Sequence, residues 1–250
     1  MKQILTRVMD IGEQMLIFGA EVHRVEESIV RMAHALGAKR IEIFIITTSM
    51  VATIYDNEDN SWSQTRRINS IETDFEKIHR LNALSRRVCD EKLTPDEMKD
   101  GLAKALDAKA YPFWLECLAY SVIAGSFTVF FGGGLTEGLV SLLVGALTRF
   151  VILFTEKAVP NKVFSKFMSS LVATILAYAA HKTGVIGIVD AVIIGNIMTL
   201  IPGIGLTNAF RDLFTGDSIS GLLRTIEAIL TALAIAAGYF IVAIFGGAVL

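Results

Sequence analysis

Apolar and polar residues are unevenly distributed along the 250-residue chain. Residues 1–112 mix apolar positions with many charged ones, whereas residues 113–250 are mostly apolar. The apolar part holds five stretches of about 18 or more residues, the length that crosses a hydrocarbon core of about 30 Å. They cover residues 113–131, 135–154, 164–181, 184–202 and 220–249. This pattern predicts an α-helical membrane protein with about five transmembrane helices in residues 113–250.

The charged part predicts a small α+β domain over residues 1–112. Four segments have apolar residues at helical spacing: 2–19, 20–36, 69–89 and 95–108. Residues 41–54 are rich in Ile, Val and Thr and predict one or two strands, and residues 61–68 predict a returning strand. Residues 56–60 are polar and predict the turn between them.

Charge follows the same division of the chain. Of the 23 Lys and Arg and the 25 Asp and Glu residues, 16 and 18 lie in residues 1–112. The net charge of −2 provides no basic field for nucleic acid. The first 30 residues lack a signal peptide's apolar core, because the run 15–20 is short and is followed by Glu21. We therefore expect the N-terminal domain to be cytoplasmic.

The distribution of cations predicts the orientation in the membrane. Lys and Arg residues gather at the ends of the spans on the N-terminal domain's side, whereas the opposite side shows only His181 and Lys182. The positive-inside rule then places the N terminus in the cytoplasm and the C terminus outside.

The fourth predicted span runs into a helix-breaking segment at residues 201–217. Pro202 lacks a backbone donor, and Gly203 and Gly205 permit sharp turning. Irregular backbone beside membrane spans is tolerated only where protein or a water-filled cavity covers it, and transporters build substrate sites from such broken helices. A cytoplasmic loop is the alternative interpretation.

Four polar residues after this break are the predicted substrate-binding residues. Thr207 or Asn208 could cap a new half-helix, whose N-terminus carries partial positive charge and suits a carboxylate. Arg211 could add a bidentate partner for that carboxylate, with Asp212 beside it. In the loop alternative, Arg211 and Asp212 form a solvated pair.

Three further residues are candidates for coupling transport to an ion. Asp190 lies inside the fourth predicted span, where a carboxylate is costly and could carry a proton, unless it sits near the outer end close to Lys182. Asn196 is a candidate for interhelical hydrogen bonding. Glu227 follows Arg224 by three residues, so the two could pair on one helix face, as a site element or as an interfacial anchor.

Other reactive groups give no sign of catalysis or of a cofactor. Cys89 and Cys117 are isolated, which argues against a disulfide framework or a zinc site. Glu116, Glu137 and Arg149 lie near predicted span ends, where snorkelling explains them. We therefore expect no catalytic residues, no metal and no cofactor.

Several stretches together resemble the threonine/serine exporter (ThrE-type) family over nearly the whole chain. They are residues 19–28, 65–68, 202–212, 216–217 and 220–224. The resemblance implies an inner-membrane exporter with a cytoplasmic N-terminal domain. Some members of that family are single chains with about twice as many spans, and others are split into two subunits. The resemblance therefore implies the larger subunit of a split exporter with a small membrane partner subunit.

These observations converge on a secondary transporter rather than an enzyme. The substrate class is a small carboxylate-bearing metabolite, because fused family members are associated with threonine and serine and split ones with succinate. The motif GxxxxGK followed by Ser or Thr is absent, so ATP hydrolysis is not indicated. If this chain transports substrate without a partner subunit, we expect it to form a homo-oligomer. The alternatives are a regulatory or scaffolding subunit, or a membrane-tethered hydrolase in which residues 1–112 do the chemistry.

Overall fold

The computed structural model describes residues 1–249, which form two compact units. The first unit comprises Met1–Lys109 together with Leu206–Thr225. The second comprises Ala110–Gly205 and the chain from Ile226 onward. The chain therefore leaves the first unit, returns to it for 20 residues, and leaves it again.

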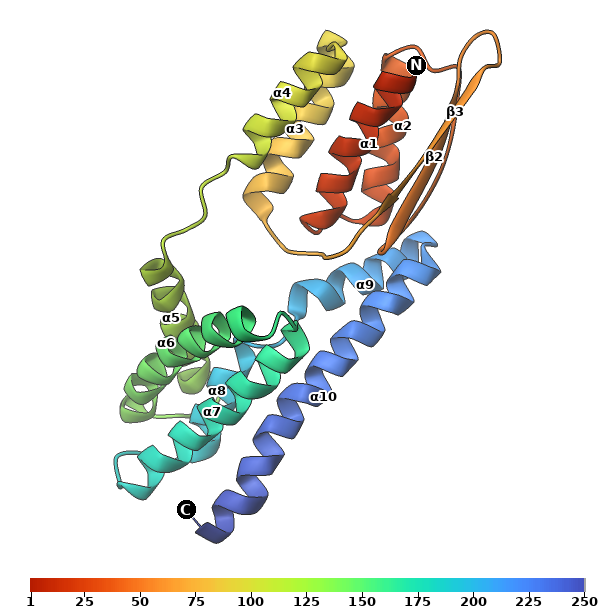
Figure 1. Cartoon of the computed structure of the whole chain (residues 1–250). Helices are drawn as coiled ribbons and strands as arrows, with labels where there is room; N and C mark the ends of the chain where they lie inside the picture. Colours follow the sequence, from red (N-terminus) through yellow and green to blue (C-terminus); the bar gives the residue numbers. More distant parts are fainter. Residues whose placement is uncertain (250) are drawn as a thin grey trace. The chain divides into compact units, whose positions relative to one another are not determined.

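Four helices and a sheet make up the N-terminal part of the first unit (Figure 1). The helices are α1 (Lys2–Ile17), α2 (Val22–Ala35), α3 (Phe75–Glu91) and α4 (Pro95–Leu106). The sequence predicted all four, but α3 begins at Phe75 rather than at residue 69. The backbone N–H groups of Glu72 and Asp74 donate to the end of α1, which holds this stretch extended. The Asp74 side chain then caps α3 by accepting from Lys77 N at 3.0 Å.

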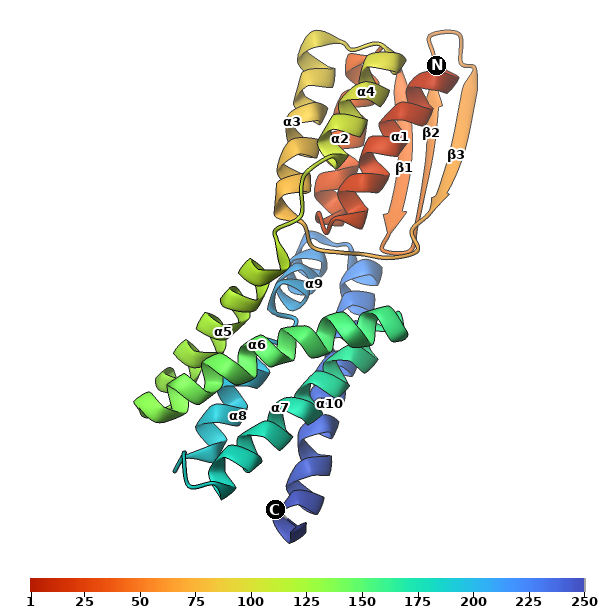
Figure 2. The ribbon, with the colours of Figure 1, turned by 60° about the vertical axis from the view of Figure 1, so that its left-hand side comes forward.

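The sheet is antiparallel, with the order β1-β2-β3. Its strands are β1 (Arg40–Ile46), β2 (Ser49–Tyr55) and β3 (Ser61–Arg67). Residues 41–54 therefore hold two strands, which turn at Thr47 and Thr48. One face of the sheet packs on α1 and α2, and α3 and α4 lie on the other side of that helix pair (Figure 2). The apolar core of this unit fills the space between these layers.

The second unit is built from long apolar helices. They are α5 (Phe113–Phe130), α6 (Leu135–Ala158), α7 (Lys162–Lys182), the short α8 (Val189–Met198) and most of α10 (Ser218–Val249). Among the described residues, α5, α6, α7 and α10 are each long and apolar enough to cross a membrane. Many large apolar side chains on these helices are exposed, as expected of surfaces that face lipid. The mostly helical membrane class is therefore confirmed.

The predicted span over residues 184–202 was wrong as a single helix. Helix α8 has ten residues, about 15 Å of rise, and bends by 55° into α9 (Gly203–Thr215) across the break at Pro202. Ahead of α8, the backbone N–H groups of Gly187 and Ile188 donate to the Glu137 carboxylate at 2.9 and 3.3 Å. These bonds hold the loop before α8 out of the helix. The described chain therefore has four spans, or five if α8 and α9 count as one bent span.

Close helix contacts in the second unit depend on small residues. A Cβ atom at Gly195 of α8 would lie 2.7 Å from Thr128 N and 2.8 Å from Ala124 O of α5. Beside this contact, the buried Asn196 side chain donates to Ser141 Oγ on α6 at 3.3 Å. Small residues and interhelical hydrogen bonds are the usual means of packing helices in lipid.

Candidate functional site

Two tight turns within the first unit carry the candidate site. The turn between α1 and α2 contains Gly19 at φ +94°, where a Cβ would lie 2.8 Å from Glu72 O. The turn between α9 and α10 contains Gly216 at φ +98°. After it, α10 runs close along α9, because a Cβ on Gly221 would lie 2.8 Å from Leu213 N. Gly216 and Gly221 bring α9 and the start of α10 together as a compact hairpin.

The hairpin holds a buried ion pair between α9 and α10. Arg224 Nε lies 3.2 Å from Asp212 Oδ2, and the two side chains are 8% and 1% exposed. Arg224 Nη2 also donates to Ala20 O, in the α1–α2 turn, at 3.2 Å. The Asp212 carboxylate faces the Val22 N–H at the start of α2, where a helix leaves its first N–H groups unpaired. Asp212 therefore links both turns.

A second ion pair lies beside the first and is more open. Arg211 pairs with Glu21, the N-cap residue of α2, and the two side chains are 54% and 21% exposed. Asn208 Nδ2 donates to Gly19 O at 3.4 Å. Three of the four predicted substrate-binding residues thus meet at the α1–α2 turn. Thr207, the fourth, is exposed on the same helix.

Acidic groups outnumber arginines at this site. Asp217 Oδ2 is buried and accepts no hydrogen bond within the described part of the chain. Burial and the nearby charge of Asp217 raise the pKa of Glu26, against the opposing effects of the Ile45 N–H and of His23.

We call Glu21, Arg211, Asp212, Asp217 and Arg224 the charged cluster. Residues 1–249 contain no group of three or more His, Cys, Asp or Glu side chains placed to hold a metal ion.

The structure corrects how the predicted substrate-binding residues are arranged. Helix α9 begins at Gly203, so Thr207 and Asn208 lie inside the helix and cap nothing. Residues 203–215 are helical rather than an irregular loop, and their place in the membrane or in the cytoplasm stays a prediction. Arg211 and Asp212 do not pair with each other, since each has a partner from another helix or turn. Their role in binding substrate stays a prediction.

The coupling candidates are not part of the charged cluster. Asp190 is exposed in the first turn of α8, Asn196 is buried, and Glu227 is exposed on α10. The expected pairing of Glu227 with Arg224 was wrong, because the Arg224 guanidinium turns toward Asp212. All three belong to the second unit, and coupling through them stays a prediction.

Comparison with known proteins shows what the chain is related to. It matches the threonine/serine exporter (ThrE) family over residues 7–246. The chain belongs to the threonine/serine exporter family. This family membership confirms the resemblance seen in the sequence, and the homologues are named as exporters rather than as enzymes.

Two relatives show how much of the known members this chain matches. It is 23% identical to a protein from Corynebacterium glutamicum named threonine/serine exporter, over 86% of this chain and 45% of the relative. It is 22% identical to a "Probable threonine/serine exporter" from Mycobacterium tuberculosis (strain ATCC 25618 / H37Rv), over 96% of this chain and 46% of the relative. The chain thus spans about half the length of the curated relatives it matches. No solved structure gives a significant match.

The sequence alone did not reveal every functional candidate in this chain. The sequence did not indicate that Glu21 and Arg224 belong to one site, although they lie in two family stretches, 19–28 and 220–224, which meet in the structure. Glu137 was expected to snorkel but is buried, since its carboxylate accepts the N–H groups of the loop before α8. Long-range contacts of this kind leave no local sequence pattern.

Proposed function

We propose that the protein exports threonine, serine or a similar small carboxylate-bearing metabolite across the membrane. The observation that carries this proposal is the Glu21–Arg211 pair beside the buried Asp212–Arg224 pair. A zwitterionic amino acid matches an exposed guanidinium and a neighbouring carboxylate, its carboxylate on Arg211 and its ammonium on Glu21. A dicarboxylate such as succinate would meet the surplus of negative charge in the charged cluster. The geometry therefore favours threonine or serine.

The buried pair is our candidate for the element that switches during transport. Removing one partner of a buried pair is costly, so Asp212 and Arg224 hold the hairpin to the α1–α2 turn only while both stay charged. Substrate that displaces Glu21 from Arg211 changes the field at Asp212. A proton moving down the membrane potential supplies about 2.3 kcal/mol per 100 mV, which is enough to drive useful export.

We further propose that a second, small membrane subunit of the same family completes the exporter. The support for it is the coverage of the relatives, of which this chain matches 45% and 46%. A homo-oligomer is the alternative if this chain transports alone.

The proposed orientation is an N terminus in the cytoplasm and a C terminus outside, in the inner membrane. The cations of the sequence support it, as does the return of the chain to the first unit. Residues 110–205 leave that unit and rejoin it, which supports an even number of crossings by these residues. Because α5, α6 and α7 make three crossings, the stretch around α8 makes the fourth, and α10 leads out again.

Uptake of labelled threonine, serine and succinate into inverted vesicles tests the proposal. The vesicles contain this chain alone or with a candidate small partner subunit. We expect the amino acids to accumulate and Arg211→Ala, correctly inserted, to abolish the uptake. Arg80→Ala is the matched control, because Arg80 is also an exposed arginine in an ion pair, with Glu76 on α3. Normal uptake by Arg211→Ala would contradict the proposed substrate contact. No uptake of any labelled metabolite, with or without the partner subunit, would favour a regulatory subunit.

A further inference from the structure

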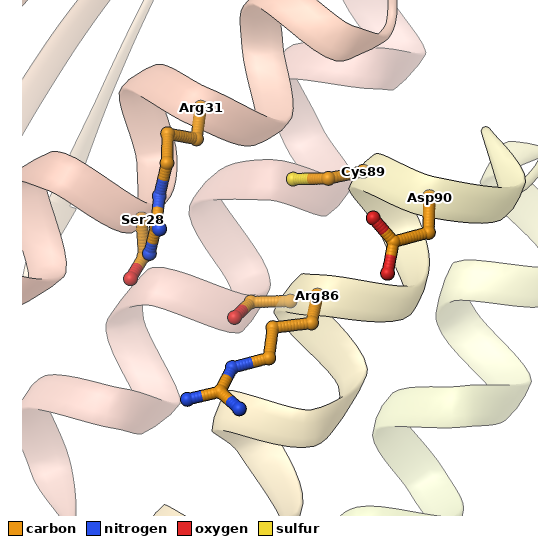
Figure 3. A pocket seen from close by; sticks show the side chains of 6 residues that line it. Ser28, Arg31, Arg86, Cys89 and Asp90 are labelled. Atoms are coloured by element: carbon orange, nitrogen blue, oxygen red, sulfur yellow. The ribbon is translucent and has the colours of Figure 1, made fainter.

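A polar cavity lies between α2 and α3, apart from the charged cluster. Its volume is about 470 Å³, within the size range of sites for small molecules. Figure 3 shows side chains of both helices around it, with the Cys89 thiol pointing from α3 toward α2. The lining residues are Ser28, Arg31, Ser85, Arg86, Cys89 and Asp90.

Two buried serines line the cavity with hydrogen-bond acceptors. Ser28 Oγ donates its hydrogen to Arg24 O at 2.8 Å, and Ser85 Oγ donates to Asn82 O at 2.9 Å. Both hydroxyl hydrogens are therefore engaged within their own helices, and the oxygens keep lone pairs for a donor in the cavity. A ligand with an ammonium or hydroxyl group supplies such a donor.

The charged residues of the cavity carry both signs. Arg86 makes no ion pair or hydrogen bond within the described part of the chain, whereas Arg31 lies 3.8 Å from a Glu27 carboxylate oxygen. Asp90 adds one carboxylate on the α3 side. Two guanidiniums and one carboxylate match a ligand that has both a carboxylate and an ammonium group. A second carboxylate on the ligand would be repelled by Asp90.

The Cys89 thiol in the cavity has low reactivity at neutral pH. Burial raises the pKa of Cys89, and the charge of Arg31 opposes this only in part. A neutral thiol is neither a strong nucleophile nor a metal ligand at neutral pH. It is, however, a reporter that a reagent can label.

We propose that this cavity binds a second molecule of the exported amino acid, outside the transport route, and so makes export respond to its concentration. The inference rests on the proposed function, because it assigns the substrate itself as the regulator. The carboxylate of the amino acid binds Arg31 and Arg86. Its ammonium group binds Asp90 and the oxygens of Ser28 and Ser85.

Protection of Cys89 from a maleimide tests this site in the purified full chain. A Cys117→Ala background leaves Cys89 as the reporter. We expect threonine and serine to slow the labelling of Cys89 severalfold, and succinate to leave it unchanged. Arg86→Gln should abolish the protection, whereas Arg87→Gln, one position along α3 in an exposed pair with Glu91, should retain it. Thermal unfolding of each variant verifies that it is folded.

The outcomes separate this site from the proposed function. Labelling unaffected by threonine, or protection that persists in Arg86→Gln, overturns the cavity site. Protection that persists in Arg211→Ala places the ligand outside the charged cluster and supports it. Export by Arg86→Gln that no longer rises with internal threonine supports the regulatory role. Protection without export by any variant or subunit combination overturns the proposed function and leaves the cavity site standing.

Discussion

At the residue scale, the Asp212–Arg224 pair buries two charges in the first unit. Neither carboxylate oxygen of Asp212 accepts a hydrogen bond of good geometry within residues 1–249, and Arg224 Nε donates none. Burying two charges with incomplete hydrogen bonding offsets much of their attraction. Buried polar groups left in this state are frequent at functional sites, where a change of partner is part of the mechanism.

We predict that Arg224→Met destabilises the protein by about 3–5 kcal/mol, because it leaves the Asp212 carboxylate buried without a counter-charge. Denaturant unfolding in detergent measures this change. The double variant Arg224→Met/Asp212→Leu should recover most of the loss, since no isolated charge remains. Arg211→Ala serves as the exposed comparison and should cost at most about 1 kcal/mol. Equal effects of the Arg224 and Arg211 variants would contradict the assignment of the buried pair.

The second prediction at this scale concerns the pH dependence of stability. Burial and the charge of Asp217 raise the pKa of Glu26 above its ordinary 4.5. The folded state therefore favours the protonated carboxyl, and this stabilisation is complete below the ordinary pKa and is lost as the pH rises through the raised one. Glu26→Gln stays neutral, so its melting temperature should rise relative to the unaltered chain across that window. A constant difference from pH 4 to about pH 8 would refute this.

At the element scale, helix starts with local chemistry were predictable and long-range ones were not. The sequence predicted a helix over residues 95–108, and the structure shows α4 starting with a capping box, in which Glu97 Oε2 accepts from Thr94 N at 2.8 Å. The start of α3 depends on bonds to the end of α1, and the length of α8 depends on Glu137. The pattern of apolar residues does not reveal either of these contacts, so the sequence prediction started both helices too early.

The close approach of α8 to α5 gives a prediction at this scale. Gly195→Ala places a Cβ against the Thr128 and Ala124 backbone, which cannot move aside as a flexible side chain can. We expect a loss of about 1–3 kcal/mol, measured by thermal unfolding in detergent. The control is Gly203→Ala at the start of α9, where a Cβ meets nothing within 4 Å and the change should be close to neutral. A neutral Gly195→Ala would show that α5 and α8 do not pack as described.

At the scale of the whole molecule, the sequence predicted the contrast between a charged part and an apolar part but not how the chain is shared between the two units. The segment Leu206–Thr225 packs with the N-terminal elements, although it lies far from them along the chain. Its partners are single residues such as Glu21 and Ala20, which no periodicity could identify. The sequence therefore identified Asn208, Arg211 and Asp212 as candidate site residues, but it did not identify the residues that they contact.

Cysteine labelling tests the proposed orientation of the whole chain. In a background without the native cysteines, Glu58→Cys in the β2–β3 turn and Thr183→Cys after α7 place thiols at exposed positions. An impermeant maleimide should label Thr183→Cys in intact cells and Glu58→Cys in inverted vesicles. Labelling of both positions from one side would contradict an odd number of crossings between them.

The ten-residue α8 also bears on the lipid around it. Its rise of about 15 Å is half the hydrocarbon thickness, a hydrophobic mismatch that the bilayer meets by thinning or the protein by lowering a loop into it. Because Glu137 already satisfies Gly187 and Ile188, that loop can enter at reduced cost. The strain of closing the remaining gap then falls on the acyl chains. Reconstitution in lipids of decreasing acyl length should therefore raise the rate of the proposed export, which would make membrane thickness a control on it.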